Sequence, residues 1–245
     1  MTRIPSALVI IALLLVAAPA AAQSTTDGWQ FSIAPYLWAS GMDGTLRIGD
    51  REQEVDASFS DIVDNLDIAL MGHFDMRNER WVLASDLIYV DLGQEKKLEA
   101  GTVTAGLDMT IVELLGGYRV SPAVALLLGA RWVDAGVDLA YDGDFAVEDA
   151  DAGESWLDPV IGVHALAPLS ERWWVGFRGD IGGFGVGSEL SWQAYADLGF
   201  RASGLISVMI GYHALDIDYE GGSGTAAVDL NLVMSGPQLG VVFTF

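Results

Sequence analysis

The side chains that could carry acid–base or metal chemistry are strongly acidic in balance. The 245-residue sequence has 34 Asp and Glu, 12 Lys and Arg, three His and no Cys, so its formal net charge is −22. Without cysteine there can be no thiol nucleophile, thiolate metal site or disulfide. Twelve basic residues spread along the chain cannot form a stripe that neutralises a run of phosphates. We therefore expect no nucleic-acid partner.

One group of residues has the types needed for general acid–base catalysis, namely His213 with Asp216 and Asp218. Successive side chains of a strand point to opposite faces, so His213 and Asp216 face apart unless a bulge intervenes. This spacing disfavours a shared site. We predict that the protein is not an enzyme, with no catalytic residue and no cofactor.

A second acidic group lies between residues 141 and 154, where six Asp and Glu occur with no Lys or Arg. Asp149, Asp151 and Glu154 partly match the spacing of a calcium-binding loop, so Ca²⁺ or Mg²⁺ could bind loosely there. The alternative is a solvated loop whose charge keeps this end of the protein soluble. We assign no metal site.

The elements that must position these residues are strands. Half of the sequence is hydrophobic (51%) and its mean hydropathy is +0.36, which excludes general disorder. In Trp81–Leu92 apolar residues alternate with a second face, a period of two that indicates a strand. The same pattern predicts ten strands: 29–39, 68–77, 81–92, 102–119, 123–140, 155–167, 173–186, 190–201, 205–219 and 228–245.

The rest of the chain predicts little else. Residues 1–22 have one early positive charge, an apolar run of 12 and small residues before position 23, the pattern of a secretory signal peptide. Residues 23–245 would then form a single domain. Beyond this segment no apolar run is long enough for a transmembrane helix. Phe59–Leu66, with Ser60 as a possible N-cap, predicts one or two helical turns.

Short and long connections alternate along the predicted strands. Four tight turns (79–80, 121–122, 169–172 and 202–204) face long, mostly acidic connections at 40–66, 93–101, 141–154 and 220–227. A transmembrane β-barrel has this asymmetry, with short periplasmic turns and longer extracellular loops. We predict an all-β fold, a closed antiparallel barrel of about ten strands. Eight or twelve strands are alternatives that depend on how Thr45–Phe59 pairs.

The tight turns also predict which polar side chains meet inside the barrel. Antiparallel register places His73 opposite Asp86, Glu113 opposite Arg131 and Arg178 opposite Asp197. Asp180 and Arg201 point to the same lumen. One interpretation is a satisfied polar core, because unpaired buried charge is costly. The other is a charged constriction in a narrow pore, although ten strands are close to the number at which side chains fill the interior.

Two features of the outer face point to a membrane. Aromatic residues gather near both ends of the strands, with Tyr89, Trp132, Trp156 and Tyr212 towards the long loops, as in the girdles of membrane barrels. Pro35, Pro159 and Pro237 interrupt strands, and we expect bulges there. The final strand places Val241, Phe243 and Phe245 on one face and ends on an aromatic residue.

With the apolar leader, these residues resemble the bacterial outer-membrane β-barrel proteins, and by size the small OmpA and OmpW types. Ala34–Trp38 together with Asp61–Leu66 is similar to an uncharacterised proteobacterial branch of that group. The resemblance implies location in the outer membrane, with the lipid bilayer and lipopolysaccharide as surroundings. It also implies that the barrel-assembly machinery reads Val241, Phe243 and Phe245. We expect a structural or surface-interaction role, with a narrow porin-like channel as the alternative.

Overall fold

The computed structural model describes residues 28–49, 51–98, 101–143, 150–222 and 227–245, and the predicted signal peptide lies outside these ranges. The described part consists of strands and one short helix. In chain order they are β1 (Gln30–Trp38), β2 (Gly41–Ile48), β3 (Arg51–Ala57), α2 (Phe59–Asp64), β4 (Leu66–Arg77), β5 (Trp81–Leu98), β6 (Gly101–Arg119), β7 (Val124–Gly143), β8 (Ala150–Pro168), β9 (Trp173–Gly183), β10 (Leu190–Arg201), β11 (Ile206–Gly221) and β12 (Val228–Thr244).

Ten of these strands close into a barrel. β1 is followed around the ring by β4 to β12, each antiparallel to the next, and β12 returns to β1. The closing pair runs from Ser32 opposite Thr244 to Trp38 opposite Gln238. Closure leaves no free sheet edge in the ring, which is what a β structure in lipid requires. The predicted all-β, ten-stranded antiparallel barrel is confirmed.

The other two strands, β2 and β3, extend the wall beyond the ring. The first part of β12 pairs with β2 and the last part pairs with β1. The register is unbroken between them, with Gly41 opposite Ser235 and Trp38 opposite Gln238. The Ala39 N–H donates to the Pro237 carbonyl at 2.8 Å across the junction. β1 and β2 thus lie end to end along β12. On the side away from β12, β1 pairs with β4 and β2 pairs with β3.

The predicted connection 40–66 is therefore mostly structured, with α2 leading from β3 to β4. The predicted N-cap Ser60 is wrong, because Ser58 caps α2. The Ser58 hydroxyl accepts from the Asp61 N–H, and the Asp61 carboxylate accepts from the Ser58 N–H at 3.0 Å. This reciprocal capping box satisfies two backbone donors at the start of the helix. The Ser58 side chain and then its N–H hold the Asp61 pKa below its ordinary value.

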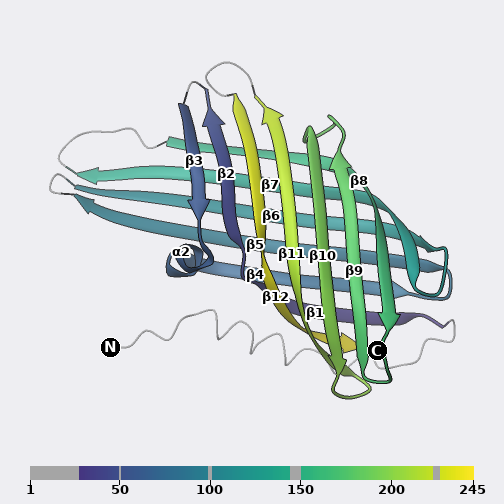
Figure 1. Cartoon of the computed structure of the whole chain (residues 1–245). Coiled ribbons are helices and arrows are strands. Elements are labelled where there is room, and N and C mark those ends of the chain that lie inside the picture. Colours follow the sequence, from purple (N-terminus) through teal and green to yellow (C-terminus); the bar gives the residue numbers. More distant parts are fainter. Residues whose placement is uncertain (1–27, 50, 99–100, 144–149, 223–226) are drawn as a thin grey trace, which may run out of the picture.

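The strands on one side of the barrel are longer than the sequence predicted. β5, β6, β7 and β8 have 18, 19, 20 and 19 residues, so most of the predicted loop 93–101 is strand. A strand crosses a bilayer in about 9–11 residues. About half of each strand therefore stands beyond the membrane. Figure 1 shows β5–β8 running across the direction of β2, β3 and β10–β12.

The predicted bulges at the three prolines are wrong. Pro35 lies opposite Gly72, Pro159 opposite Ala130 and Pro237 opposite Tyr212, and the residues beside each proline keep the same register. A proline removes one backbone donor, but its carbonyl still accepts and no extra residue is needed. The register between β4 and β5 shifts instead between Leu66 and Ile68.

The outer face of the ring is an apolar belt edged by aromatic rings. At the end with the short turns, Trp81 packs edge-on against Tyr118 at 5.3 Å and Trp173 packs against Phe200 at 5.0 Å. Between the edges the belt exposes aliphatic and aromatic side chains, among them Ile33, Leu37, Leu114, Leu126, Leu128, Trp132, Leu157, Ile161, Phe177, Ile181, Val208, Ile210, Tyr212 and Leu239. This is the surface that meets lipid.

Trp156 departs from the predicted outer girdle. It is 7% exposed, points inward and stacks on Tyr219 with ring centroids 3.9 Å apart. Among the described residues, no helix combines the length and apolar character needed to span a membrane.

Candidate functional site

Three levels follow one another inside the barrel, from the short turns to the outer end. A polar cavity occupies the half next to the short turns, four charged side chains lie above it, and apolar side chains fill the outer half. We call these levels the lower cavity, the charged cluster (Glu113, Arg131, Arg178 and Asp180) and the outer core. Residues two apart on each strand share the inward face, which is how one strand contributes to all three levels.

Arg131 on β7 is the centre of the charged cluster. Its Nε donates to Glu113 Oε1 on β6 at 2.6 Å, and its Nη2 donates to Asp180 Oδ1 on β9 at 2.6 Å. The three side chains are at most 2% exposed. Charge-assisted bonds of this length fix both partners. Arg131 therefore joins β7 to β6 beside it and to β9 two strands further around the ring.

Arg178 on β9 closes the cluster. Its Nη2 donates to Glu113 Oε2 at 2.6 Å and lies 2.8 Å from Asp180 Oδ2. The contact with Asp180 is electrostatic rather than a hydrogen bond, because Oδ2 has no aligned donor among the described residues. Two guanidinium groups thus balance two carboxylates where solvent does not reach. Charged side chains are tolerated in a buried position when each charge is paired in this way.

Asp158, Ser188 and Ser191 extend the cluster, and the sequence reading missed all three. Asp158 Oδ2 accepts from the Ser188 hydroxyl at 2.5 Å and from the Ser191 hydroxyl at 3.0 Å, while Oδ1 accepts from the Ser188 N–H at 2.7 Å. The Ser191 hydroxyl also accepts from Arg131 Nη1 at 3.1 Å. Asp158 lies opposite Arg131 on β8. The register between β7 and β8 could not be predicted from the sequence, because a long connection joins these strands and only a tight turn fixes a register.

The predicted pairing of Arg178 with Asp197 is wrong. Arg178 lies opposite Tyr195, and Asp197 lies opposite Gly176. The backbone turns early, because Gly183, Phe184 and Gly185 have positive φ of 86°, 56° and 69°. β9 therefore ends at Gly183 instead of continuing to position 186, which moves the register by two residues.

Asp197 and Arg201 reach other partners. Asp197 Oδ1 accepts from Gln238 Nε2 at 2.6 Å, in the wall of the lower cavity. Arg201 is exposed at the end of the barrel and donates to the Glu171 carbonyl at 3.0 Å. Neither residue belongs to the charged cluster.

His73 and Asp86 do meet. The register places them opposite each other, with His73 Nδ1 3.0 Å from Asp86 Oδ2. The Tyr36 hydroxyl donates to Asp86 Oδ1 at 2.8 Å. The sequence reading missed Tyr36, although its inward parity on β1 and the closure of the barrel bring it there. This carboxylate fixes one histidine nitrogen and leaves the ring facing the lower cavity.

His213 is committed to packing. It is 3% exposed, stacks on Trp38 with centroids 4.1 Å apart and contacts Gln193 Oε1 through Nε2 at 3.0 Å. Asp216 lies three residues on, with the opposite parity, and is half-buried on the other face of β11. The structure therefore does not bring His213 and Asp216 together.

The acidic residues named as metal ligands are only partly described. Asp149 lies outside the described residues, and Asp151 is described only as a strand position. Glu154 Oε2 accepts from the Tyr219 hydroxyl at 3.4 Å. Within the described ranges no group of three or more His, Asp or Glu side chains is placed to hold a metal ion.

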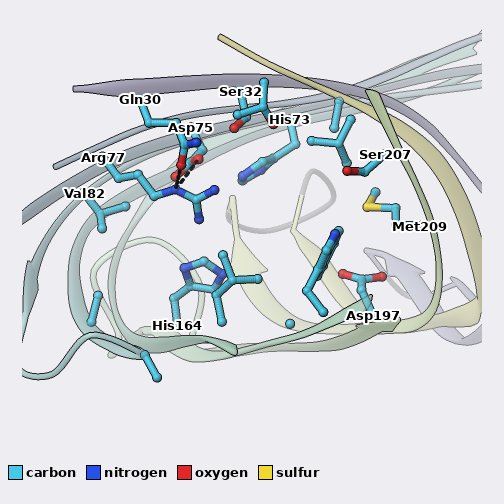
Figure 2. Close-up of a pocket in the computed structure, with 18 of the residues that line it drawn as sticks. Gln30, Ser32, His73, Asp75, Arg77, Val82, His164, Asp197, Ser207 and Met209 are labelled. Atoms are coloured by element: carbon cyan, nitrogen blue, oxygen red, sulfur yellow. Dashed lines mark hydrogen bonds and ion pairs between the residues drawn. The ribbon is translucent and has the colours of Figure 1, made fainter. Parts of the chain in front are cut away.

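The lower cavity has a volume of about 800 Å³ and is bordered at its open end by residues of the short turns, including Asn78, Pro122 and Gly204. Figure 2 shows polar side chains from several strands around it. Above the charged cluster, a pocket among the described residues of the outer core, bordered by Met42, Trp156 and Tyr219, measures about 70 Å³. Val133, Leu215 and Ile217 are fully buried there, and Trp156 packs among them.

The chain is similar to several solved structures. The outer-membrane protease OmpT of Escherichia coli is similar with a TM-score of 0.56 and 9% identity, over 92% of this chain and 99% of that one. The translocator domain of the autotransporter NalP of Neisseria meningitidis gives 0.44 and 13%, over 97% and 95%. Ail of Yersinia pestis gives 0.42 and 9%, over 90% and 100%. No protein-family model and no curated protein matches the sequence.

Ring closure, the apolar belt and the likeness to OmpT define the class: the chain has the fold of the bacterial outer-membrane β-barrels, and the bilayer is its context. An identity of 9% shows the fold alone and gives no activity.

Proposed function

We propose that this chain is a closed, non-conducting outer-membrane barrel with a structural or surface-interaction role. The charged cluster is the observation that carries the proposal. Its four side chains lie inside the lumen and are at most 2% exposed, and fully buried apolar residues lie above them. A pathway for ions would have to open both levels. Breaking a buried charge pair leaves an uncompensated ion, which costs several kcal/mol.

The surface role rests on the outer half of the molecule. β5–β8 and the β2–β3 pair stand beyond the apolar belt as a folded extension (Figure 1). Strand pairing and the outer core make this extension rigid, so it presents a fixed shape at the cell surface.

Planar-bilayer recording tests the closed lumen. We expect purified protein to give no steady conductance. The contradicting result is steady conductance in the wild-type protein that changes in Arg178→Ala or Glu113→Gln. Arg172→Ala, at an exposed turn, is the matched control. Each variant must first show heat-modifiable mobility, which reports a folded barrel.

A narrow diffusion channel for small solutes is the second candidate. The lower cavity favours it, because about 800 Å³ of the lumen is already open from the short-turn end. In that case liposomes containing the protein would swell in small solutes, and Arg131→Ala would alter the rate. Liposomes that fail to swell would eliminate this candidate.

We also propose that no catalysis takes place here. The packing of His213 against Trp38 supports this, because a stacked, buried ring is poorly placed to transfer protons to a substrate. Assays of peptide and lipid A turnover test it, with His213→Ala as the control. Turnover that the wild-type protein shows and the variant lacks would overturn it.

Assembly and surface partners complete the proposal. Val241 and Phe243 lie on the strand that closes the ring, where Phe243 faces Ile33, and Phe245 follows it and exchanges backbone hydrogen bonds with Phe31. These three residues are suited to be read by the barrel-assembly machinery after removal of residues 1–22. Lipopolysaccharide would surround the belt, and Ca²⁺ or Mg²⁺ would bind loosely at the acidic loops. A Phe243→Ser variant that still assembles at the wild-type rate would contradict the assembly signal. Unchanged heat resistance after chelation would contradict the metal ions.

A further inference from the structure

The lower cavity contains hydrogen-bonding groups that the protein itself does not use. Ser32 and Asp75 face each other across β1 and β4 and are 5% and 6% exposed. Neither Ser32 Oγ nor Asp75 Oδ2 has a hydrogen-bond partner among the described residues. Both residues line the cavity, as Figure 2 shows. Buried polar atoms without a partner are costly, so two such acceptors in one cavity point to a ligand that supplies donors.

The lining of the cavity offers several carboxylates to a cation. Asp75, Asp86 and Asp197 bring carboxylates from three strands. Two arginines at the rim keep their positive charge, and their donors are taken up by backbone carbonyls: Arg119 donates to those of Asn78 and Pro122, and Arg201 to that of Glu171.

Arg77 is the remaining arginine of the lining. Its Nε donates to Gln30 Oε1 at 3.0 Å and lies 3.7 Å from Asp75 Oδ1. That longer contact leaves Oδ2 of the same carboxylate without a donor. The formal charge of −22 over the whole chain adds a field that draws cations towards the barrel.

Aromatic rings form another part of the wall. Tyr36, Trp174 and Tyr195 all line the cavity. The indole ring of Trp174 lies against the β10 backbone at Gly199. A Cβ at this glycine would come within 1.9 Å of the ring. Only glycine permits this approach, which turns the indole into part of the cavity surface. Aromatic faces attract cations at distances up to about 6 Å.

From these contacts we propose that the lower cavity binds a small organic cation, an ammonium compound, that enters from the side of the short turns. Asp75 and Ser32 accept its hydrogen bonds, and the aromatic wall covers its carbon chain. The volume of about 800 Å³ lies within the range of small-molecule sites. The charged cluster lies beyond the lining of the cavity, so binding does not require passage through the barrel.

The absence of cysteine from the sequence permits a direct test of the cavity's charge. Ser32→Cys introduces one thiol at the unused acceptor, and its modification is followed with a cationic trimethylammonium-ethyl and an anionic sulfonatoethyl methanethiosulfonate. We expect the cationic reagent to react at least tenfold faster, and this preference to fall in Ser32→Cys with Asp75→Asn. Val63→Cys, exposed on α2, is the control for intrinsic reactivity. Equal rates at position 32 after correction by this control would overturn the proposal.

Binding itself is tested with putrescine, a diammonium compound, against 1,4-butanediol, which has the same chain length and no charge. Titration calorimetry of the folded protein in detergent should show binding of putrescine alone. Asp75→Asn should weaken it at least tenfold, because a charge-assisted hydrogen bond is lost. Asp134→Asn, which removes an acidic side chain on the outer face of β7, should bind as the wild-type protein does. The proposal fails if putrescine does not bind, if butanediol binds equally, or if both variants bind alike.

Discussion

The two halves of the lumen are built from the same strands and yet have opposite contents. Towards the short turns, inward positions carry Ser32, His73 and Asp75 around open space. Towards the outer end, inward positions carry Leu215, Ile217 and Val133 with no exposed surface. The long strands, such as β7, extend from this outer half (Figure 1). One half of the lumen is thus a packed apolar core, as in a soluble protein, and the other half is a cavity with polar side chains in its lining.

The charged cluster separates these halves and explains why both can exist. Arg131 and Arg178 hold Glu113 and Asp180 at the boundary through buried ion pairs. Above this level buried apolar side chains from several strands pack together. Below it a cavity of about 800 Å³ remains.

The largest effect is expected from breaking the boundary itself. Arg131→Met leaves Glu113 and Asp180 buried beside one arginine instead of two, so the free energy of unfolding should fall by about 3–5 kcal/mol. Urea unfolding followed by tryptophan fluorescence measures this change. Arg172→Met, at an exposed turn, should change it by less than about 0.5 kcal/mol. Equal losses in both variants would show that the cluster does not stabilise the barrel.

A smaller loss is expected in the outer core. Leu215→Ala removes a fully buried side chain and should lower the free energy of unfolding by about 2–5 kcal/mol, because a void remains among packed neighbours. The same unfolding assay applies. Leu169→Ala, 62% exposed at a short turn, is the control and should be nearly neutral. A neutral Leu215→Ala would mean that the outer half is not packed as a core.

One substitution made at two levels sharpens the comparison further. Ser191→Ala removes a hydroxyl that joins Arg131 to Asp158 and should cost about 1–3 kcal/mol. Ser32→Ala removes a buried hydroxyl without a partner among the described residues, so the free energy of unfolding should not fall. If the order of the two losses were reversed, the contrast between the charged cluster and the lower cavity would be wrong.

The smallest effect is expected outside both halves, at α2. Hydrogen bonds from Ser58 lower the Asp61 pKa, so the capping contribution is present above the ordinary pKa and is lost as the pH falls through the lowered value. Ser58→Ala should raise the Asp61 pKa towards its ordinary value, as NMR titration of the carboxylate would show. An Asp61 titration that Ser58→Ala leaves unchanged would remove this role.

Much of the fold could be predicted because a strand repeats every two residues. The alternation gave the ten strands of the ring, the tight turn at 79–80 paired His73 with Asp86, and the turn at 121–122 paired Glu113 with Arg131. The error at Arg178 has a local cause, since three successive positive φ angles at Gly183–Gly185 are not visible as a break in the pattern. The predicted bulges at the prolines were wrong because a missing backbone donor does not by itself shift the register. The strand pairing continues through each proline.

The sequence by itself determined which side chains face lipid and which face the lumen, because parity along a strand needs no knowledge of the neighbouring strands. Only the tertiary structure decided which inward residues meet across the barrel. Arg131 reaches Asp180 and Ser191, 49 and 60 residues away, because the ring places β9 and β10 only two and three strands from β7. The division into a cavity and a core likewise depends on which inward side chains of different strands meet, a property of the closed barrel that no single strand contains.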